Sequence, residues 1–263
     1  MDQIDEIDSD LIAALIKSDK WLERTSQRPS TPAPGSMLAG DDLKTSPYQL
    51  SRAAAWSLTN GVDHFHALRC LLLDGKTIHI SAPFTLLRAS IENTSTAVYL
   101  LAPAQQQERV FRRLNLQWAE LLDAQSARSL VGASAIPMEE RKKELRGLAR
   151  DTGMSESKIQ SVVGRPASTG SIVSFAGKQC FGPSGDAGRL AWMVNSGFAH
   201  GRTWAQVAIN EKVAPRAGED LTMARMTPSI KMISQFAQMT VCIIEKGWQL
   251  LDRGNSGSIS GGE

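Results

Sequence analysis

Four polar residues on apolar helical stretches have the side chains needed for proton transfer or anion binding. His200 lies in RLAWMVNSGFAHG and His64 lies in GVDHFHALRCLLL, whereas Arg88 and Glu92 are one helical turn apart in TLLRASIENTSTAVYLL. An imidazole can move protons near neutral pH, and a guanidinium can bind a phosphate through two hydrogen bonds. If these helices face each other, His200, Arg88, Glu92 and His64 are candidate catalytic residues.

Each of these residues also has a structural interpretation. A single histidine on an apolar helix is more often packed in a core than catalytic, and an Arg–Glu pair at this spacing is more often a surface salt bridge. His66 and Cys70 have the same spacing but form a poor metal pair without further ligands. The chain has no P-loop, G-x-G-x-x-G, G-x-S-x-G or H-E-x-x-H motif, so we expect no metal and no cofactor.

A second motif, ELRGLARDTGMSESKIQSVVG (144–164), has the spacing of a helix-turn-helix. The small Ala149 lets two helices approach, Gly153 allows a tight turn, and Ile159 packs the second helix back. Polar residues of 155–160 would then face a DNA groove, and the basic residues 141–143 would meet phosphates. A purely structural corner between two helices needs the same three residues, so both interpretations stay open.

A third segment, GRPASTGSIVSF (164–175), combines Arg165 with small hydroxyl residues. This composition is suited to binding an anion. The alternative is a loop that crosses the end of a helical bundle.

The elements expected around these motifs are helices. Apolar residues at helical spacing predict helices over 4–24, 82–101, 105–131, 138–151, 155–163, 184–210 with Ser184 as N-cap, and 228–252. Residues 48–73 are expected to form either one long helix or two short ones with a break at Asn60-Gly61. Segment 164–183 is expected to be irregular. We find no alternating strands and no repeat, so the expected fold is all-α, a bundle of four or five long helices.

The domain organisation follows from composition. Residues 1–25 are expected to form an amphipathic helix that docks on the main body or on a partner, and the four prolines of 26–47 predict a linker or a long ordered loop without a helix or strand. The bundle domain then covers 48–252, with the helix-turn-helix-like corner at 144–164, and 253–263 is expected to be a disordered tail.

Charge and cysteine usage exclude several classes of protein. The net charge of +2 gives no global attraction to nucleic acid or membrane, although 105–165 is mildly basic. Three widely separated cysteines argue against a disulfide framework, and no apolar run is long enough to span a membrane. We expect a cytoplasmic protein without a membrane partner.

The order of sequence blocks resembles a known group. DHF (63–65), LLRASIE (86–92), ERVFRRL (108–114), GRPASTGSIV (164–173) and NSGFAHG (195–201) resemble a family of uncharacterised actinobacterial helical proteins. More distantly, the chain is similar to the HEPN superfamily, which includes RNA-cleaving toxins and defence nucleases. The resemblance covers roughly 48–252 and implies a helical fold, RNA or nucleotide binding, and a site formed where two protomers of a homodimer meet.

The resemblance also implies roles for residues near His200. HEPN nucleases carry an arginine, four to six intervening residues and then a histidine. His200 matches the histidine, but Asn195 (four intervening residues) or Met193 (six) stands at the position of the arginine. Arg88 or Arg202 would then supply the positive charge that stabilises the transition state. Ser196 shares a helical stripe with His200. The candidate substrate-binding residues are therefore Ser196 and the three residues named above for anion binding or for their place in the motif: Arg165, Asn195 and Arg202.

Three hypotheses about function follow. The first is an HEPN-like protein that binds RNA or a nucleotide, as a metal-independent ribonuclease of a defence or toxin system. The second is a DNA-binding regulator that uses 144–164. The third is a non-catalytic interaction protein whose N-terminal helix engages a partner.

Overall fold

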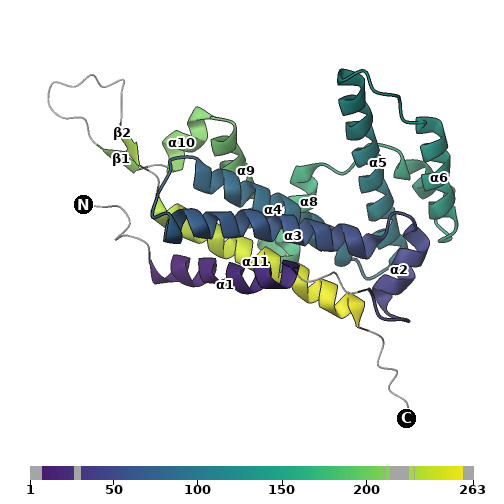
Figure 1. Ribbon diagram of the computed structural model, residues 1–263, viewed down its shortest axis with the longest axis horizontal. Helices are drawn as coiled ribbons and strands as arrows, with labels where there is room; N and C mark the ends of the chain where they lie inside the picture. Colours follow the sequence, from purple (N-terminus) through teal and green to yellow (C-terminus); the bar gives the residue numbers. More distant parts are fainter. Residues whose placement is uncertain (1–7, 27–30, 210, 214–224, 228, 257–263) are drawn as a thin grey trace, which may run out of the picture.

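The computed structural model describes residues 8–26, 31–209, 211–213, 225–227 and 229–256. These residues are predominantly helical, which confirms the predicted all-α fold (Figure 1). Two short antiparallel strands, β1 (Glu211–Val213) and β2 (Arg225–Thr227), pair with each other between the last two helices of the chain. Over the described part of the chain, helices lack the combination of length and apolar character needed to cross a membrane.

Three long helices form the centre of the molecule. α3 (Leu50–Arg69), extended by a π-helical turn (Cys70–Asp74), packs along α4 (Ala82–Leu101), and α11 (Ile230–Asn255) packs on both (Figure 1). The bounds of α4 agree with the prediction, with Pro83 in the first turn, where its missing N–H is not needed. The largest fully buried side chains, which include Phe65, Phe84 and Ile91, lie in this core.

Of the two possibilities for 48–73, the single helix is confirmed and the break at Asn60-Gly61 is wrong, because α3 is continuous there. Gly61 instead lets α3 and α4 come close together. A Cβ at this position would lie 2.3 Å from Thr94 Cγ2, and the Gly61 carbonyl accepts a hydrogen bond of 2.7 Å from Ser90 Oγ. Gly61 therefore allows close contact between α3 and α4 and does not bend α3.

Replacing Gly61 with alanine is expected to destabilise the protein by about 1–3 kcal/mol, because the added methyl group overpacks the α3–α4 contact. Urea denaturation followed by circular dichroism measures the change. Gly147→Ala is the matched control: Gly147 is also inside a helix, with nothing within 4 Å of its Cβ position. That variant should be neutral or more stable by roughly 0.5–1 kcal/mol, and equal losses in both variants would contradict the explanation.

The N-terminal helix docks on the main body. α1 (Ser9–Ser26) buries Leu11, Ala14 and Leu15 against α3 and α11. Ion pairs with α11 join Lys17 to Glu245 and Arg24 to Asp252. These three side chains are thus covered by this chain itself, whereas Ile12 and Ile16 of α1 stay exposed. The expected first residues of the helix, 4–7, lie outside the described residues.

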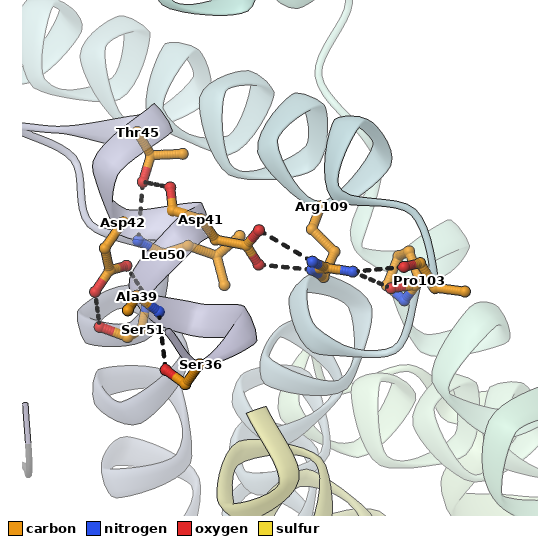
Figure 2. Close-up of polar contacts among 10 residues, drawn as sticks. Ser36, Ala39, Asp41, Asp42, Thr45, Leu50, Ser51, Pro103 and Arg109 are labelled. Carbon is orange, nitrogen blue, oxygen red and sulfur yellow. Dashed lines mark hydrogen bonds and ion pairs between the residues drawn. The ribbon is translucent and has the colours of Figure 1, made fainter. Parts of the chain in front are cut away.

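The expected linker at 26–47 is wrong over α2 (Met37–Thr45), a short helix with Ser36 as its N-cap. Its Asp41 forms a buried ion pair with Arg109, shown in Figure 2, with distances of 2.6 and 3.0 Å between carboxylate oxygens and guanidinium nitrogens. Arg109 Nη1 also donates to the carbonyls of Pro103 and Ala104. The prolines of 26–47 favour a loop, so the local sequence does not predict α2. The helix is stabilised by the ion pair with Arg109, a residue far along the chain.

An accessory corner projects from one end of the central layer (Figure 1). It consists of α5 (Gln106–Leu130), α6 (Met138–Arg150) and α7 (Glu156–Val162), which share a second small core. Ala149 and Ile159 are buried in this core and Gly153 has φ of 73°, so all three motif residues have structural roles. Arg141 and Lys142 pair with acids on their own helix, and Lys158 of α7 pairs with Glu108 of α5.

Glu108 links α5 to α7, and its loss should have a pH-dependent effect. Partial burial raises the pKa of Glu108, but hydrogen bonds from Lys158 and Arg112 outweigh it and lower the pKa below its ordinary value. Its stabilising contribution is therefore present above the unfolded-state pKa and lost as pH falls through the lower folded-state pKa. Glu108→Gln should cost up to about 1 kcal/mol near neutral pH and less in acid.

Unfolding curves at pH 7 and pH 3 measure this difference. Glu139→Gln serves as the control, because Glu139 is 85% exposed in its ion pair with Lys142 and should matter little at either pH. A destabilisation by Glu108→Gln that grows toward low pH would contradict the assignment.

Two predictions after residue 163 are wrong. The expected irregular segment 164–183 contains α8 (Thr169–Phe181), which is N-capped by Ser168 and buries Ile172, Val173 and Ala176 at helical spacing. The expected single helix 184–210 is two helices, α9 (Asp186–Ala199) and α10 (Thr203–Ile209), and α9 has Gly185 rather than Ser184 as N-cap. α11 runs through Asn255, into the expected tail, of which 257–263 lies outside the described residues.

Candidate functional site

Arg88, Glu92, Trp192 and His200 form one hydrogen-bonded cluster between α4 and α9. Arg88 Nε donates to Glu92 Oε1 at 2.8 Å, and Arg88 Nη1 lies 3.1 Å from His200 Nε2. Trp192 Nε1 donates to the same Glu92 oxygen at 2.7 Å. The side chains of Arg88 and Glu92 are 25% and 27% exposed, so the cluster is accessible from solvent.

Aromatic packing and a helix end place His200 beside Arg88. The Phe84 and Phe198 rings stack with centroids 3.9 Å apart, which fixes the end of α9 one turn from Arg88 along α4. Gly201, with φ of 63°, ends the helix, while the N–H groups of Gly201 and Arg202 donate to the carbonyls of Phe198 and Gly197. This is a Schellman motif. His200 is therefore the C-cap of α9. The sequence predicted that it would lie in the interior of a helix over 184–210.

The hydrogen bond assigns the tautomer of His200. A guanidinium can only donate, so Nε2 must be the unprotonated, accepting nitrogen of the imidazole. A phosphate that bound Arg88 Nη1 would replace this nitrogen as acceptor. The imidazole would then be free to take a proton from a ligand, which couples anion binding to the availability of a base.

The other predicted site residues lie in different environments. Asn195 is fully buried with neither amide atom hydrogen-bonded, so its amide is closed to a ligand from solvent. Ser196 is half-buried, whereas Arg202 is exposed beside His200 in the turn that ends α9. Arg165 is exposed in the loop before α8, and His64 is half-buried on α3. Within the described residues, none of these five side chains has a hydrogen bond or ion pair to the Arg88 cluster.

A groove of about 440 Å³ lies next to the cluster. It is lined by residues of α8 and α9 and of the turn before α8: Ser168, Gly170, Ser171, Ser174, Phe175, Lys178 and Arg189. Gly170 connects it to the cluster, because a Cβ there would lie 3.5 Å from the Trp192 ring. We call this surface the serine groove; its two cationic side chains have no acidic partner in the described part of the chain.

Sequence reasoning missed Trp192 and Lys178. Trp192 is two turns before His200 at i,i+4,i+8 spacing, so stepping back from His200 in fours would have placed it on the same stripe. Lys178 belongs to a segment that was expected to be irregular and therefore had no predicted face. The anion-binding character predicted for 164–175 remains a prediction, now centred on Ser168, Ser171 and Ser174 rather than on Arg165.

His66 and Cys70 also contact each other, with Nε2 and Sγ 3.4 Å apart. His66 Nδ1 lies 3.3 Å from Ser18 Oγ and 3.6 Å from an oxygen of Asp19. In the described ranges, no group of three or more His, Cys, Asp or Glu residues has a geometry suited to a metal ion.

Fold and cluster together define an all-α protein with a solvent-accessible Arg–His–Glu–Trp cluster. Comparison with known proteins identifies no relative: no protein-family model, curated protein or solved structure matches the chain.

Proposed function

We propose that the chain binds single-stranded RNA at the Arg88 cluster and cleaves it without a metal ion, as an HEPN-like ribonuclease. The observation that carries the proposal is the distance of 3.1 Å between Arg88 Nη1 and His200 Nε2, in a cluster open to solvent. A cation for the phosphate and a neutral imidazole for proton transfer are the minimal groups for metal-independent cleavage.

The proposed reaction is attack of a ribose 2′-oxygen on the adjacent phosphorus. The phosphate takes the Arg88 Nη1 donor, and His200 Nε2 accepts the proton of the 2′-hydroxyl. The bond from phosphorus to the 5′-oxygen breaks, and that oxygen leaves with a proton from solvent. Arg88 stabilises the charge that develops on the phosphorane oxygens, and Glu92 holds Arg88 in place through its Nε.

The serine groove favours binding of an RNA strand over binding of a single phosphate. Lys178 and Arg189 provide positive charge for neighbouring phosphates, and the Trp192 ring lies between the groove and the cluster. Phosphate contacts by basic side chains account for most of the affinity for nucleic acid and weaken with salt. A strand that follows this surface would place one phosphate at Arg88.

A homodimer is part of the proposal. Leu190, Met193, Trp204 and Val207 of α9 and α10 are between 37% and 60% exposed and flank the helix end that carries His200. Large exposed apolar side chains that gather on one surface are typical of protein interfaces. Light scattering should give twice the 28.5 kDa mass of one chain, and Met193→Asp should reduce it to the monomer.

The test incubates wild-type protein and His200→Ala with total RNA and with labelled duplex DNA at low salt. The proposal expects RNA cleavage by the wild type, RNA retention without cleavage by His200→Ala, and weaker interaction with the duplex. Retention of duplex DNA in preference to RNA would favour the regulator that uses 144–164. Failure to retain either nucleic acid would leave a non-catalytic interaction protein as the better description.

A further inference from the structure

A second cleft lies outside the proposed RNA site, where α3, α4 and α5 meet. Its volume is about 400 Å³, within the range of small-molecule sites. α3 contributes Arg52 and Trp56, α4 contributes Thr96, and α5 contributes Arg113 and Glu120. We call it the Arg113 cleft.

Arg113 is buried, with only 6% of the residue exposed, yet its hydrogen bonding is incomplete. Nε donates to the Tyr48 carbonyl at 3.1 Å and Nη2 donates to Gln117 Oε1 at 2.6 Å. Nη1 has no hydrogen-bond partner, and the Glu120 carboxylate is 3.6 Å away from it. Nη1 is therefore in an ion pair with Glu120 but has no hydrogen-bond acceptor, and a buried donor without an acceptor is costly; burial lowers the pKa of Arg113. An anion at Nη1 would remove that cost.

Trp56 gives the cleft a flat apolar wall. It is 69% exposed, which is unusual for so large a side chain on a helix of the central layer. Arg52 lies one turn earlier on the same face and is also exposed. The cleft carries two positive charges, from Arg52 and Arg113, and one negative charge, from Glu120, so it favours a negatively charged ligand. The exposed Trp56 ring favours a ligand that also has an aromatic ring.

We propose that the Arg113 cleft binds a small organic anion in which a flat aromatic ring carries a phosphate or carboxylate group. The acidic group accepts hydrogen bonds from Arg113 Nη1 and Arg52, and the ring stacks on Trp56. Glu120 lies nearest to Nη1 and competes with the ligand for it, so it weakens binding. This site is separate from His200 and does not depend on RNA cleavage.

Isothermal titration calorimetry with the full chain tests the proposal. Adenosine 5′-monophosphate and indole-3-acetate are the phosphate and carboxylate probes; adenosine and inorganic phosphate supply ring and charge alone. At least one acidic probe should bind about tenfold or more tightly than either control. Binding by neither acidic probe, or equal binding of adenosine and its monophosphate, would overturn the proposal.

Variants locate the binding. Trp56→Ala should weaken it about tenfold or more, because one stacked ring is lost. Glu120→Gln should tighten it about two- to fivefold by removing the competing carboxylate, without disturbing the Arg113 hydrogen bonds that hold Tyr48 and Gln117. Trp204→Ala, a control at an exposed tryptophan of α10, and His200→Ala should leave affinity unchanged. Binding that survives Trp56→Ala but is lost in His200→Ala would place the ligand elsewhere and contradict the assignment.

Discussion

Replacing Arg88 with alanine is expected to lower the rate of the proposed RNA cleavage by about 10²–10³-fold, as when one donor to a developing negative charge is removed from other enzymes. The loss has two physical sources. The phosphorane loses its guanidinium, and the free protein loses the hydrogen bond of 3.1 Å that holds the His200 ring beside the site before the phosphate takes Arg88 Nη1. Single-turnover cleavage of a labelled single-stranded RNA measures the rate.

Matched variants separate site chemistry from a general loss of charge. Arg253→Ala removes an exposed arginine from the last turn of α11 and should leave the rate within about twofold of wild type. Arg88→Lys keeps the charge but cannot contact Glu92 and His200 with two separate nitrogens, so it should retain only part of the activity. Full activity of Arg88→Ala would remove Arg88 from the mechanism.

Replacing Asp41 with asparagine is expected to destabilise the fold by about 3–5 kcal/mol, the usual cost of leaving one partner of a buried ion pair without its counter-charge. Asp41 is fully buried and the Arg109 side chain is 4% exposed, so solvent cannot compensate (Figure 2). For a chain of this size the melting temperature falls roughly 2–4 °C per kcal/mol. Thermal unfolding therefore should shift by about 10 °C.

The matched control is Glu245→Gln in the exposed ion pair with Lys17, where both side chains are about half exposed. Such pairs contribute at most about 1 kcal/mol. The double variant Asp41→Leu with Arg109→Met should recover part of the loss, because it removes both charges and leaves neither unpaired. If Asp41→Asn costs no more than Glu245→Gln, the ion pair does not anchor α2.

Much of the fold could be predicted from the sequence, because long amphipathic helices have a strong periodic signal. Proline and apolar spacing defined α4, and the predicted bounds of α5, α6 and α7 agree with the structure within one residue at every end. Short helices rich in Gly, Ser or Thr were missed. α8 depends on packing of Val173 and Ala176 against the core, and α2 depends on the Asp41–Arg109 pair. Neither dependence is visible in a local window.

The candidate site was accessible to sequence reasoning only in its parts. Residue type and spacing singled out Arg88, Glu92 and His200. In the structure Arg88 lies within hydrogen-bonding distance of both Glu92 and His200. It also separates Asn195 from solvent, although Asn195 is only five residues before His200. Which side chains meet depends on the Phe84–Phe198 stack and on the turn at Gly201, which are tertiary features. Catalytic roles for these residues stay a prediction.

The most direct measurement follows a single-stranded RNA, labelled at its 5′ end, incubated with the wild-type protein in excess EDTA. Because the proposed chemistry uses the RNA 2′-hydroxyl, His200 and Arg88 but no metal ion, we predict cleavage products that end in a 2′,3′-cyclic phosphate. The same strand with a 2′-deoxyribose at the cleaved position should stay intact. If the wild type leaves the RNA uncut, or cuts both strands equally, the Arg88 cluster is not the ribonuclease site proposed here.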